Sequence, residues 1–459
     1  MPAPPRSPGV CAASAAEGNR LARPLRSALR TPAMLPIVAQ DQPDFAEALA
    51  RLETRGELDF AKVEGAVRTI LEEVRRDGDA AVRRFVERFE GRCVATLHRA
   101  PYGGEDALAR LDSGVRGVLE RATDRIARFH EHQREAGFRL VDGGLIVGTR
   151  TQPIARAAVY APGGKARYPS SVLMAAVPAR IAGVPEVILA TPLAGDANDD
   201  LILAAAHLAG VTSVVDAGGA QAIAAVAFGT ETIPRVDKIV GPGNIYVATA
   251  KRLVFGAVSI DSIAGPSEIL VLADGSASPE VVAADLLSQA EHDEAAYPLL
   301  ACTSDAFARA VGHALEAQLA TLPRRAIAEA ALRGQGIALI VRDVNALVEV
   351  ANRVAPEHLA IHTHDPEAVA LGTLRAGAIF IGASTPEAAG DYLAGPSHVL
   401  PTGGAVRFGS PLGVYDFQKR SSIIHVSDAG AQTLGRVAAA LAYGEGLQAH
   451  ARSAEYRLK

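Results

Sequence analysis

The chain has 459 residues, a length that predicts two or three domains with ample burial. Hydrophobic residues make up 49% and charged residues 21%, and this ordinary balance excludes a disordered or collagen-like chain. The 46 Lys and Arg residues against 51 Asp and Glu give a formal net charge of −5, which argues against broad binding to nucleic acids or membrane surfaces.

Residues 1–33 differ in composition from everything after them. The segment carries five arginines and one acid, Glu17, and it has no apolar run long enough for a secretory signal. We expect a disordered or processed extension, with Met34 opening the folded part. The alternative is an organellar transit peptide, because such peptides are rich in Arg and poor in acids.

Residues 34–137 carry the periodicity of helices. Phe60–Val86 and Val115–Phe129 place apolar residues three and four apart, with Arg and Glu between them. We expect an N-terminal helical part that packs with the second of the two α/β domains predicted below and serves as scaffold.

From about Ile154 onward, short apolar strands alternate with helices, each bounded by Gly or Pro. This alternation is typical of parallel α/β sheets. The sequence therefore predicts two Rossmann-like parallel α/β domains, residues 138–266 and 267–412, and a C-terminal helical tail, residues 413–459. The predicted strands are Ala157–Tyr160, Glu186–Ala190, Ser213–Asp216, Lys238–Val240, Ile269–Ala273, Leu299–Ala301, Ile337–Ile340 and Ala378–Ile381.

Two features of the chain bear on its compartment. The least charged stretch, Leu201–Thr230, contains Asp216 and several glycines, which favours a buried strand-turn-helix over a membrane span. The three cysteines, Cys11, Cys93 and Cys302, show no CxxC spacing. A disulfide framework or thiolate zinc site is therefore not expected, and a reducing cytoplasm is the expected location.

Three predicted strand-to-helix junctions in the first α/β domain are rich in glycine. They are Tyr160–Lys165, Gly218–Gln221 and Gly241–Asn244. Glycine lets backbone N–H groups approach an anionic ligand at a helix N-terminus, in the crevice where open α/β sheets bind ligands. None fits G-x-G-x-x-G, so tight turns remain an alternative to nucleotide contacts.

A second group of candidate residues lies in and near the helix Pro279–His292. Gln289 and His292 stand three apart, which places a carbonyl oxygen and an imidazole nitrogen on one helical face, where they could share a cation. A surface pair is the alternative for so short a pattern. Asp391 and His450 are candidates for further ligands, but spacing alone does not select them.

Two further stretches carry residues suited to proton transfer. Glu357 and His358 follow Pro356, and each could serve a separate transfer, since histidine titrates near neutrality. A solvated turn is the alternative. Gly390–His398 crowds Gly, Pro, Asp and His, which indicates an ordered functional loop.

Taken together, these stretches closely resemble the histidinol dehydrogenase family. The resemblance runs in family order from about Ile154 to the C-terminus, fits the N-terminal helical part less specifically, and excludes residues 1–33. The matching stretches are Tyr160–Met174, Gly218–Thr230, Val236–Lys251, Ile260–Glu268, Asp285–His292, Ala355–Ile361, Gly390–Gly404 and Glu445–Ala451.

The resemblance implies an oxidoreductase, EC 1.1.1.23, with one Zn²⁺ per subunit and NAD⁺ as cofactors. It implies that Glu357 and His358 form the acid/base pair, and that the tail, exchanged in a homodimer, brings Glu445 and His450 to the neighbour's site. The implied zinc ligands are Gln289, His292, Asp391 and His450. The implied histidinol contacts are Ser267, His358, Glu445 and the four zinc ligands, and the implied NAD contacts are Tyr160, Gln221 and Asn244. His398 also lies in a family motif, near the substrate.

The implied reaction is the four-electron oxidation of L-histidinol to L-histidine through L-histidinal, with two NAD⁺, in the last steps of histidine biosynthesis. His358 would take the hydroxyl proton and Glu357 would deprotonate the water that attacks the aldehyde. A cysteine nucleophile is not expected, because neither Cys93 nor Cys302 falls in a family motif. A dehydrogenase of another amino alcohol and a binding protein without redox activity are the alternative functions.

Overall fold

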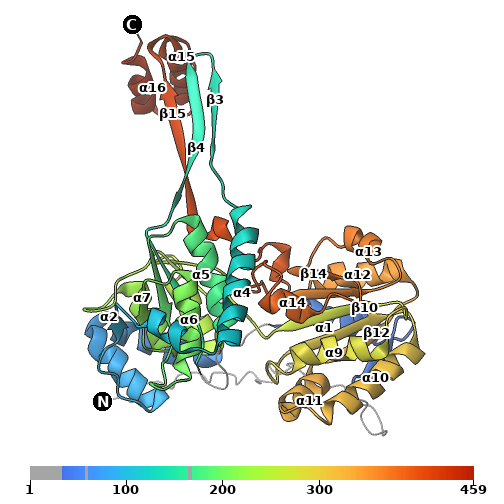
Figure 1. Cartoon of the computed structure of the whole chain (residues 1–459). Helices are drawn as coiled ribbons and strands as arrows, with labels where there is room; N and C mark the ends of the chain where they lie inside the picture. The colour runs from blue at the N-terminus through green and yellow to red at the C-terminus, as the bar shows by residue number, and fades with distance from the viewer. Residues whose placement is uncertain (1–33, 57–59, 164–167, 459) are drawn as a thin grey trace, which may run out of the picture. The chain divides into compact units, whose positions relative to one another are not determined.

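The computed structural model describes residues 34–56, 60–163 and 168–458. The predicted extension, residues 1–33, lies outside these described residues, as does part of the first glycine loop. Two six-stranded sheets and one three-stranded sheet organise the described chain (Figure 1).

The first six-stranded sheet has the order β2-β7-β6-β5-β8-β9, parallel except for the antiparallel edge strand β2. Because β5 lies between β6 and β8, the chain reverses its direction of winding at β5, and a crevice opens there at the carboxyl ends of the strands. Its strands are β2 (His98–Arg99), β5 (Arg156–Tyr160), β6 (Glu186–Ala190), β7 (Ser213–Val215), β8 (Lys238–Val240) and β9 (Ser259–Ile260). Its helices are α5 (Pro169–Ala182), α6 (Asp199–Ala209), α7 (Gly219–Phe228) and α8 (Ile245–Val254).

The second six-stranded sheet is wholly parallel, with the order β1-β12-β11-β10-β13-β14. Alternate residues of β10 enter two apolar clusters, so helices cover both faces and every residue of this strand is buried. Its strands are β1 (Ile37–Ala39), β10 (Glu268–Ala273), β11 (Tyr297–Cys302), β12 (Ile337–Ile340), β13 (His358–His362) and β14 (Ala378–Ile381). Its helices are α1 (Phe45–Glu53), α9 (Pro279–Ala290), α10 (Asp305–Leu319), α11 (Arg325–Gly334), α12 (Val344–Val354), α13 (Pro366–Gly372) and α14 (Glu387–Tyr392).

The N-terminal helical part differs from its prediction. Only β1 and α1 join the second sheet, where β1 pairs with β12 and α1 packs on α12. The other three helices pack on the first domain instead. Helix α2 (Ala61–Glu90) packs on α7 and α8, α3 (Gly104–Arg110) packs on α6, and α4 (Ser113–Glu131) packs on α5. Helical periodicity identifies a buried face but not the sheet that the face covers, which is why the prediction for residues 34–137 is wrong for most of this part.

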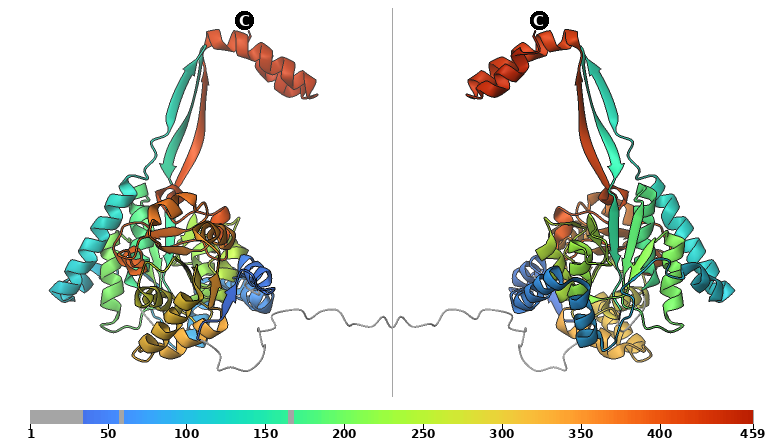
Figure 2. Two further views of the ribbon diagram at one scale, coloured as in Figure 1. Left: turned by 90° about the vertical axis from the view of Figure 1, so that its right-hand side faces the viewer. Right: turned by 90° about the vertical axis from the view of Figure 1, so that its left-hand side faces the viewer.

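A three-stranded antiparallel sheet joins the start of the first predicted domain to the tail. Its order is β15-β4-β3, from β3 (Phe138–Asp142), β4 (Leu145–Pro153) and β15 (Gln418–Val426), and β4 pairs with β15 along its whole length (Figure 2). The tail continues into α15 (Asp428–Gly444) and α16 (Gln448–Glu455), which pack on each other. Two short 3₁₀ helices, Ala405–Arg407 and Val414–Phe417, precede this tail. The sheet is missing from the sequence prediction because its strands are exposed or half-buried and do not alternate between buried and exposed residues.

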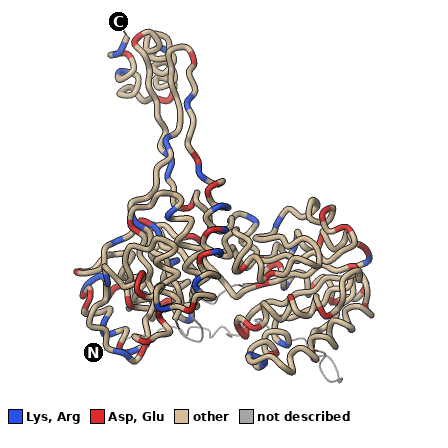
Figure 3. Tube along the Cα trace, in the orientation of Figure 1, with Lys and Arg blue, Asp and Glu red and all other residues tan. Residues whose placement is uncertain are grey.

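The remaining elements agree closely with their predicted ranges, and the prediction of two parallel α/β units is confirmed. Leu201–Thr230 forms α6, β7, α7 and their connections, with most of its side chains buried among other helices. In the described part of the chain, no helix combines the length and apolarity needed to cross a membrane. Figure 3 shows basic and acidic residues interspersed along the chain, in keeping with its small net charge.

Candidate functional site

Glu357 and His358 lie together at the amino-terminal end of β13, beside the first residue of the neighbouring strand β10. His358 is the first residue of β13 and stands opposite Ile269, so that Glu268, the first residue of β10, is its neighbour. Oε2 of Glu357 accepts a hydrogen bond from the Glu268 amide over 2.9 Å and lies 3.6 Å from Nδ1 of His358. The two predicted acid/base side chains are therefore buried, adjacent and fixed by the backbone.

The two ring nitrogens of His358 differ in their surroundings. Nδ1 lies 3.0 Å from the Glu268 carbonyl oxygen and 3.6 Å from Oε1 of Glu387. Nε2 lies 3.8 Å from Oδ1 of Asp391 and makes no hydrogen bond with a described residue. Nε2 is therefore the ring atom free to exchange a proton with a bound molecule.

Gln289 occupies the last turn of α9, fully buried beside this pair. Its Nε2 donates to Oε1 of Glu387 over 2.6 Å and to the Glu268 carbonyl oxygen over 3.2 Å, and lies 2.9 Å from Nδ1 of His358. Its Oε1 is buried without a hydrogen-bond partner in the described chain. An orphaned buried carbonyl oxygen is costly unless a cation or another donor satisfies it, so the amide fits a metal ligand.

Glu387 is a site residue that the sequence analysis missed. With His358 and Asp391 it forms a group whose ligand atoms all lie within 4.8 Å of one another, a spacing suited to a metal ion. Its Oε2 also accepts a hydrogen bond from Oγ of Ser288 over 2.7 Å. The available signal was its position four residues before Asp391, which places both acids on one face of α14.

The predicted zinc ligands are only partly brought together. Gln289 and Asp391 face the His358 ring, and His292 lies in the turn directly after α9, where its amide donates to the Gln289 carbonyl oxygen over 3.2 Å. Loss of solvent around its ring lowers the pKa of His292, while the Asp391 carboxylate opposes this shift. His450 lies exposed on α16, and within the described part of the chain no hydrogen bond or ion pair links it to this group.

Two more predicted residues flank the group, and a third does not. Nδ1 of His398 lies 3.0 Å from the Asp391 carbonyl oxygen, and its Nε2 lies 3.3 Å from Oγ of Ser171. Burial lowers the pKa of His398. Ser267 directly precedes β10, beside Glu268, whereas Glu445 lies exposed at the end of α15.

Burial and the neighbouring charges act in opposite directions on the pKa values of Glu357, Glu387 and His358. Burial raises the pKa of Glu357, and burial raises the pKa of Glu387 to about 7. Burial alone would lower the pKa of His358, but the Glu357 and Glu387 carboxylates outweigh it and raise that pKa to about 10. The site thus holds a buried imidazole among buried carboxyl groups whose pKa values are raised, a combination typical of functional sites.

The glycine-rich loops follow β5, β7 and β8, at one edge of the first sheet. The Tyr160 hydroxyl accepts a hydrogen bond from the Gly219 amide over 3.0 Å, and burial raises the pKa of Tyr160 to about 12. Gln221 donates to Oε1 of Glu90 over 3.3 Å, and Asn244 caps α8 through its Oδ1. At Gly241, with φ 111°, an added Cβ would lie 2.2 Å from the Tyr160 carbonyl oxygen, so only glycine fits.

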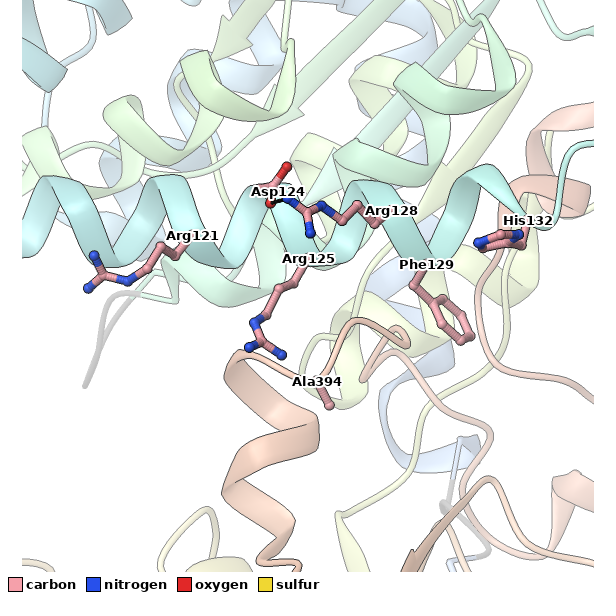
Figure 4. Close-up of a pocket in the computed structure, with 7 residues that line it drawn as sticks. All are labelled: Arg121, Asp124, Arg125, Arg128, Phe129, His132 and Ala394. Carbon is pink, nitrogen blue, oxygen red and sulfur yellow. Dashed lines mark ion pairs between the residues drawn. The ribbon is translucent and has the colours of Figure 1, made fainter.

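An open basic pocket of about 550 Å³ lies beside the loop that follows Asp391 (Figure 4). It is formed by one face of α4 and by Ala394. Among its arginines, Arg128 is paired with Asp124 over 2.8 Å. The residues that line it are Arg121, Asp124, Arg125, Arg128, Phe129, His132 and Ala394.

Glycine loops at the winding reversal of one parallel sheet, together with a buried imidazole and carboxylates on a second, are the parts of a dinucleotide-dependent oxidoreductase. The family model described as histidinol dehydrogenase matches residues 53–458. The chain belongs to the histidinol dehydrogenase family, whose members are NAD-dependent oxidoreductases.

Individual relatives agree over nearly the whole chain. Histidinol dehydrogenase of Chromobacterium violaceum is 50% identical over 428 residues, 92% of this chain and 98% of the relative. That of Syntrophotalea carbinolica is 51% identical over 429 residues, 93% of this chain and 100% of the relative. The crystal structure of histidinol dehydrogenase from Elizabethkingia anophelis superposes with a TM-score of 0.86 at 32% identity, covering 92% of this chain and 98% of that one.

Proposed function

We propose that this chain oxidises L-histidinol to L-histidine through L-histidinal, at the expense of two NAD⁺. The observation that carries the proposal is the buried group of His358, Glu357 and Gln289, in a chain of this family, with Nε2 of His358 free to exchange a proton. Histidinol dehydrogenases are named for this substrate, and the predicted site residues of the second domain converge on that group.

The proposed chemistry consists of two hydride transfers and one addition of water. His358 takes the hydroxyl proton of the alcohol as the carbon-bound hydride passes to the first NAD⁺, which leaves an aldehyde. Glu357 takes a proton from water as its oxygen attacks the aldehyde carbon, and His358 returns the proton gained in the first step to the carbonyl oxygen, which gives a diol. His358 then takes one hydroxyl proton of the diol as the second hydride passes to another NAD⁺, which gives the carboxylic acid and two NADH in all.

We propose that zinc is held by Gln289, His292 and Asp391, with His450 supplied by a partner. The orphaned Oε1 of Gln289 supports this ligand set, because its amide nitrogen is already committed to Glu387 and Glu268. Oxygen and nitrogen ligands suit Zn²⁺ in a site that accepts an imidazole and an amine. Bound zinc would orient the substrate, which alone can lower a barrier by several kcal/mol.

We propose that NAD⁺ binds over the three glycine-rich loops, with Tyr160, Gln221 and Asn244 in contact with it. All three residues stand at the edge of the sheet where the winding reverses. The Tyr160 hydroxyl accepts from the Gly219 amide, so its own hydrogen would be available to donate to a phosphate. Ser267 and Glu445 are proposed to contact the substrate.

We propose a homodimer in which each tail completes the site of the other subunit. Glu445 and His450 are exposed on the tail helices, although the roles proposed for them require contact with substrate and zinc. The same helices expose Val437, Leu441 and Tyr456, the last with 86% of its surface accessible, which marks a face that a partner would cover. The basic pocket on α4 borders Ala394, three residues after Asp391, and would receive an acidic part of such a tail.

The experiment that tests this function is the yield of NADH from limiting L-histidinol, measured with and without a chelator. Two NADH per histidinol, lost on chelation and restored by zinc, is the expected result. A protein that binds zinc and NAD⁺ but does not oxidise histidinol would contradict the proposal and direct the search to other amino alcohols.

A further inference from the structure

Ala355 is the one residue other than glycine, within the described part of the chain, whose φ is positive. Its backbone is left-handed, with φ 50° and ψ 65°, and its side chain is fully buried. A Cβ disfavours this conformation, and glycine usually occupies the left-handed position that ends a helix. Here the residue ends α12, and the chain passes through Pro356 into Glu357 and His358. The strained turn therefore sets the direction of the chain between the end of α12 and the proposed acid/base pair.

Arg55 binds this turn from the end of α1, which packs on α12. The side chain lies just after α1 and is buried, with 4% of its surface exposed. Its guanidinium donates to the Val354 carbonyl oxygen over 2.6 Å and to the Ala355 carbonyl oxygen over 3.1 Å. Both carbonyl groups adjacent to the strained torsions are thus bound by one charged donor, and charge-assisted hydrogen bonds are stronger than neutral ones.

The charge of Arg55 is balanced by Glu268, through a buried ion pair. The same Glu268 carboxylate accepts a hydrogen bond from the Glu357 amide over 3.2 Å, and the Glu268 amide donates to Oε2 of Glu357 over 2.9 Å. Its carbonyl oxygen lies 3.0 Å from Nδ1 of His358. One residue therefore joins Arg55 to both members of the proposed acid/base pair.

We propose that Arg55 is a positioning residue for catalysis, which fixes the left-handed turn at Ala355 and, through Glu268, the placement of Glu357 and His358. The inference rests on the roles proposed above for Glu357 and His358. Lysine cannot replace the guanidinium, because four acceptors (the carbonyl oxygens of Leu52, Val354 and Ala355 and the Glu268 carboxylate) are served by one planar group.

The test compares Arg55→Lys, Ala355→Gly and the double variant, each checked for folding by circular dichroism and thermal unfolding. We expect Arg55→Lys to lower kcat by about tenfold to a hundredfold, as small displacements of catalytic groups do. The KM for NAD⁺ should change by less than about twofold, because the glycine loops lie on the other sheet. Ala355→Gly should restore part of the lost kcat, since glycine adopts the left-handed conformation without a Cβ clash.

Arg353→Met is the matched control. Arg353 also lies near the end of α12 but forms a half-exposed ion pair with Glu53. The kcat of the Arg353→Met variant should therefore remain near that of the wild type. An unchanged kcat in Arg55→Lys, or no recovery by Ala355→Gly, would overturn the inference. Should Arg55→Lys fail to fold, Glu268→Gln takes its place, and a wild-type kcat in that folded variant would overturn the inference as well.

The wild-type protein in the same assay separates this inference from the proposed function. A wild type that does not oxidise histidinol overturns the proposed function. In that case, the thermal unfolding of Arg55→Lys with and without Ala355→Gly decides whether Arg55 holds the turn: glycine should recover stability in the Lys variant, and no recovery overturns the inference.

Discussion

Gln289 donates a hydrogen bond from Nε2 to Oε1 of Glu387 over 2.6 Å, and both side chains are buried. With the second amide hydrogen directed to the Glu268 carbonyl oxygen, the orientation of the Gln289 amide is fixed. Its oxygen is consequently presented to the site without a partner. Glu387 thus prepares Gln289 to bind a cation, without having to bind one itself.

Replacing this carboxylate should weaken zinc binding. Glu387→Gln replaces a carboxylate that accepts hydrogen bonds from both Gln289 and Ser288 by a neutral amide with one acceptor oxygen. Gln289 is then held less firmly, so we expect the affinity for zinc to fall about tenfold to a hundredfold, as for other partners of metal ligands. Competition with a chromogenic chelator measures this affinity directly. Glu367→Gln is the control. Glu367 also lies in the first turn of a short helix, α13, but its side chain is exposed, whereas Glu387 in the first turn of α14 is buried. Equal zinc affinity in the two variants would contradict the role of Glu387.

The two proposed acid/base residues should differ in the half-reaction that they serve. His358→Asn should slow the oxidation of both histidinol and supplied histidinal by about 10² to 10⁴-fold, because the ring nitrogen is lost from both proton transfers. Glu357→Gln should mainly slow the oxidation of histidinal, which needs an activated water. Single-turnover formation of NADH from each substrate separates the two effects. Equal losses in both assays for Glu357→Gln would argue against this division.

The sequence predicts those parts of the site that lie within one short element. Gln289 and His292 are one turn apart, and Glu357 and His358 are adjacent, so local spacing brings each pair together. Glu387 could not be selected in this way. Its approach to Gln289 depends on the packing of α14 on α9, two elements that are about a hundred residues apart in the chain. The position of Glu387 four residues before Asp391 places both acids on one face of α14, but this spacing does not point to a contact with Gln289.

Burial explains which strands could be predicted. β6, β8 and β12 are short apolar runs between turn residues, and their observed bounds match the prediction. β4 and β15 pair over nine residues each, yet their side chains are mostly exposed or half-buried, so no apolar pattern marks them. The two strands also lie far apart in the sequence, so no local pattern indicates that they pair.

A buried ion pair beside the proposed NAD loop should contribute to stability only while both partners are present. Nζ of Lys251 donates to the Gly241 carbonyl oxygen over 2.8 Å and pairs with Asp261, which accepts the Gly241 amide over 2.7 Å. Lys251→Met leaves a buried carboxylate unpaired, so we expect the free energy of unfolding to fall by about 3 to 5 kcal/mol. Denaturant unfolding measures the change. The double variant with Asp261→Asn should be more stable than Lys251→Met alone, and the reverse order would contradict the argument.

Cys302 should be inert in the native protein. It is fully buried at the end of β11, and burial raises the pKa of its thiol to about 11, so very little thiolate forms at neutral pH. We expect a thiol reagent to modify the exposed Cys93 and to reach Cys302 only after unfolding. Mass spectrometry of the labelled peptides reads this out. Cys302→Ala should retain turnover within about twofold, whereas loss of histidinal oxidation alone would revive a cysteine intermediate.

Exchange of the tail should allow two inactive variants to complement each other. In a dimer of Glu357→Gln with His450→Ala, one site would combine both defects, and the other would combine an intact body with an intact tail. Random mixing makes about half of the dimers mixed, so we expect recovery of about a quarter of the wild-type activity. Co-expression with two affinity tags isolates the mixed dimers and raises the expected recovery to about half. The control pairs Glu357→Gln with His358→Asn, whose defects lie in the same body, so that no combination restores a site. If each subunit used its own tail, the first pair would remain as inactive as this control, because every site would then carry one defect.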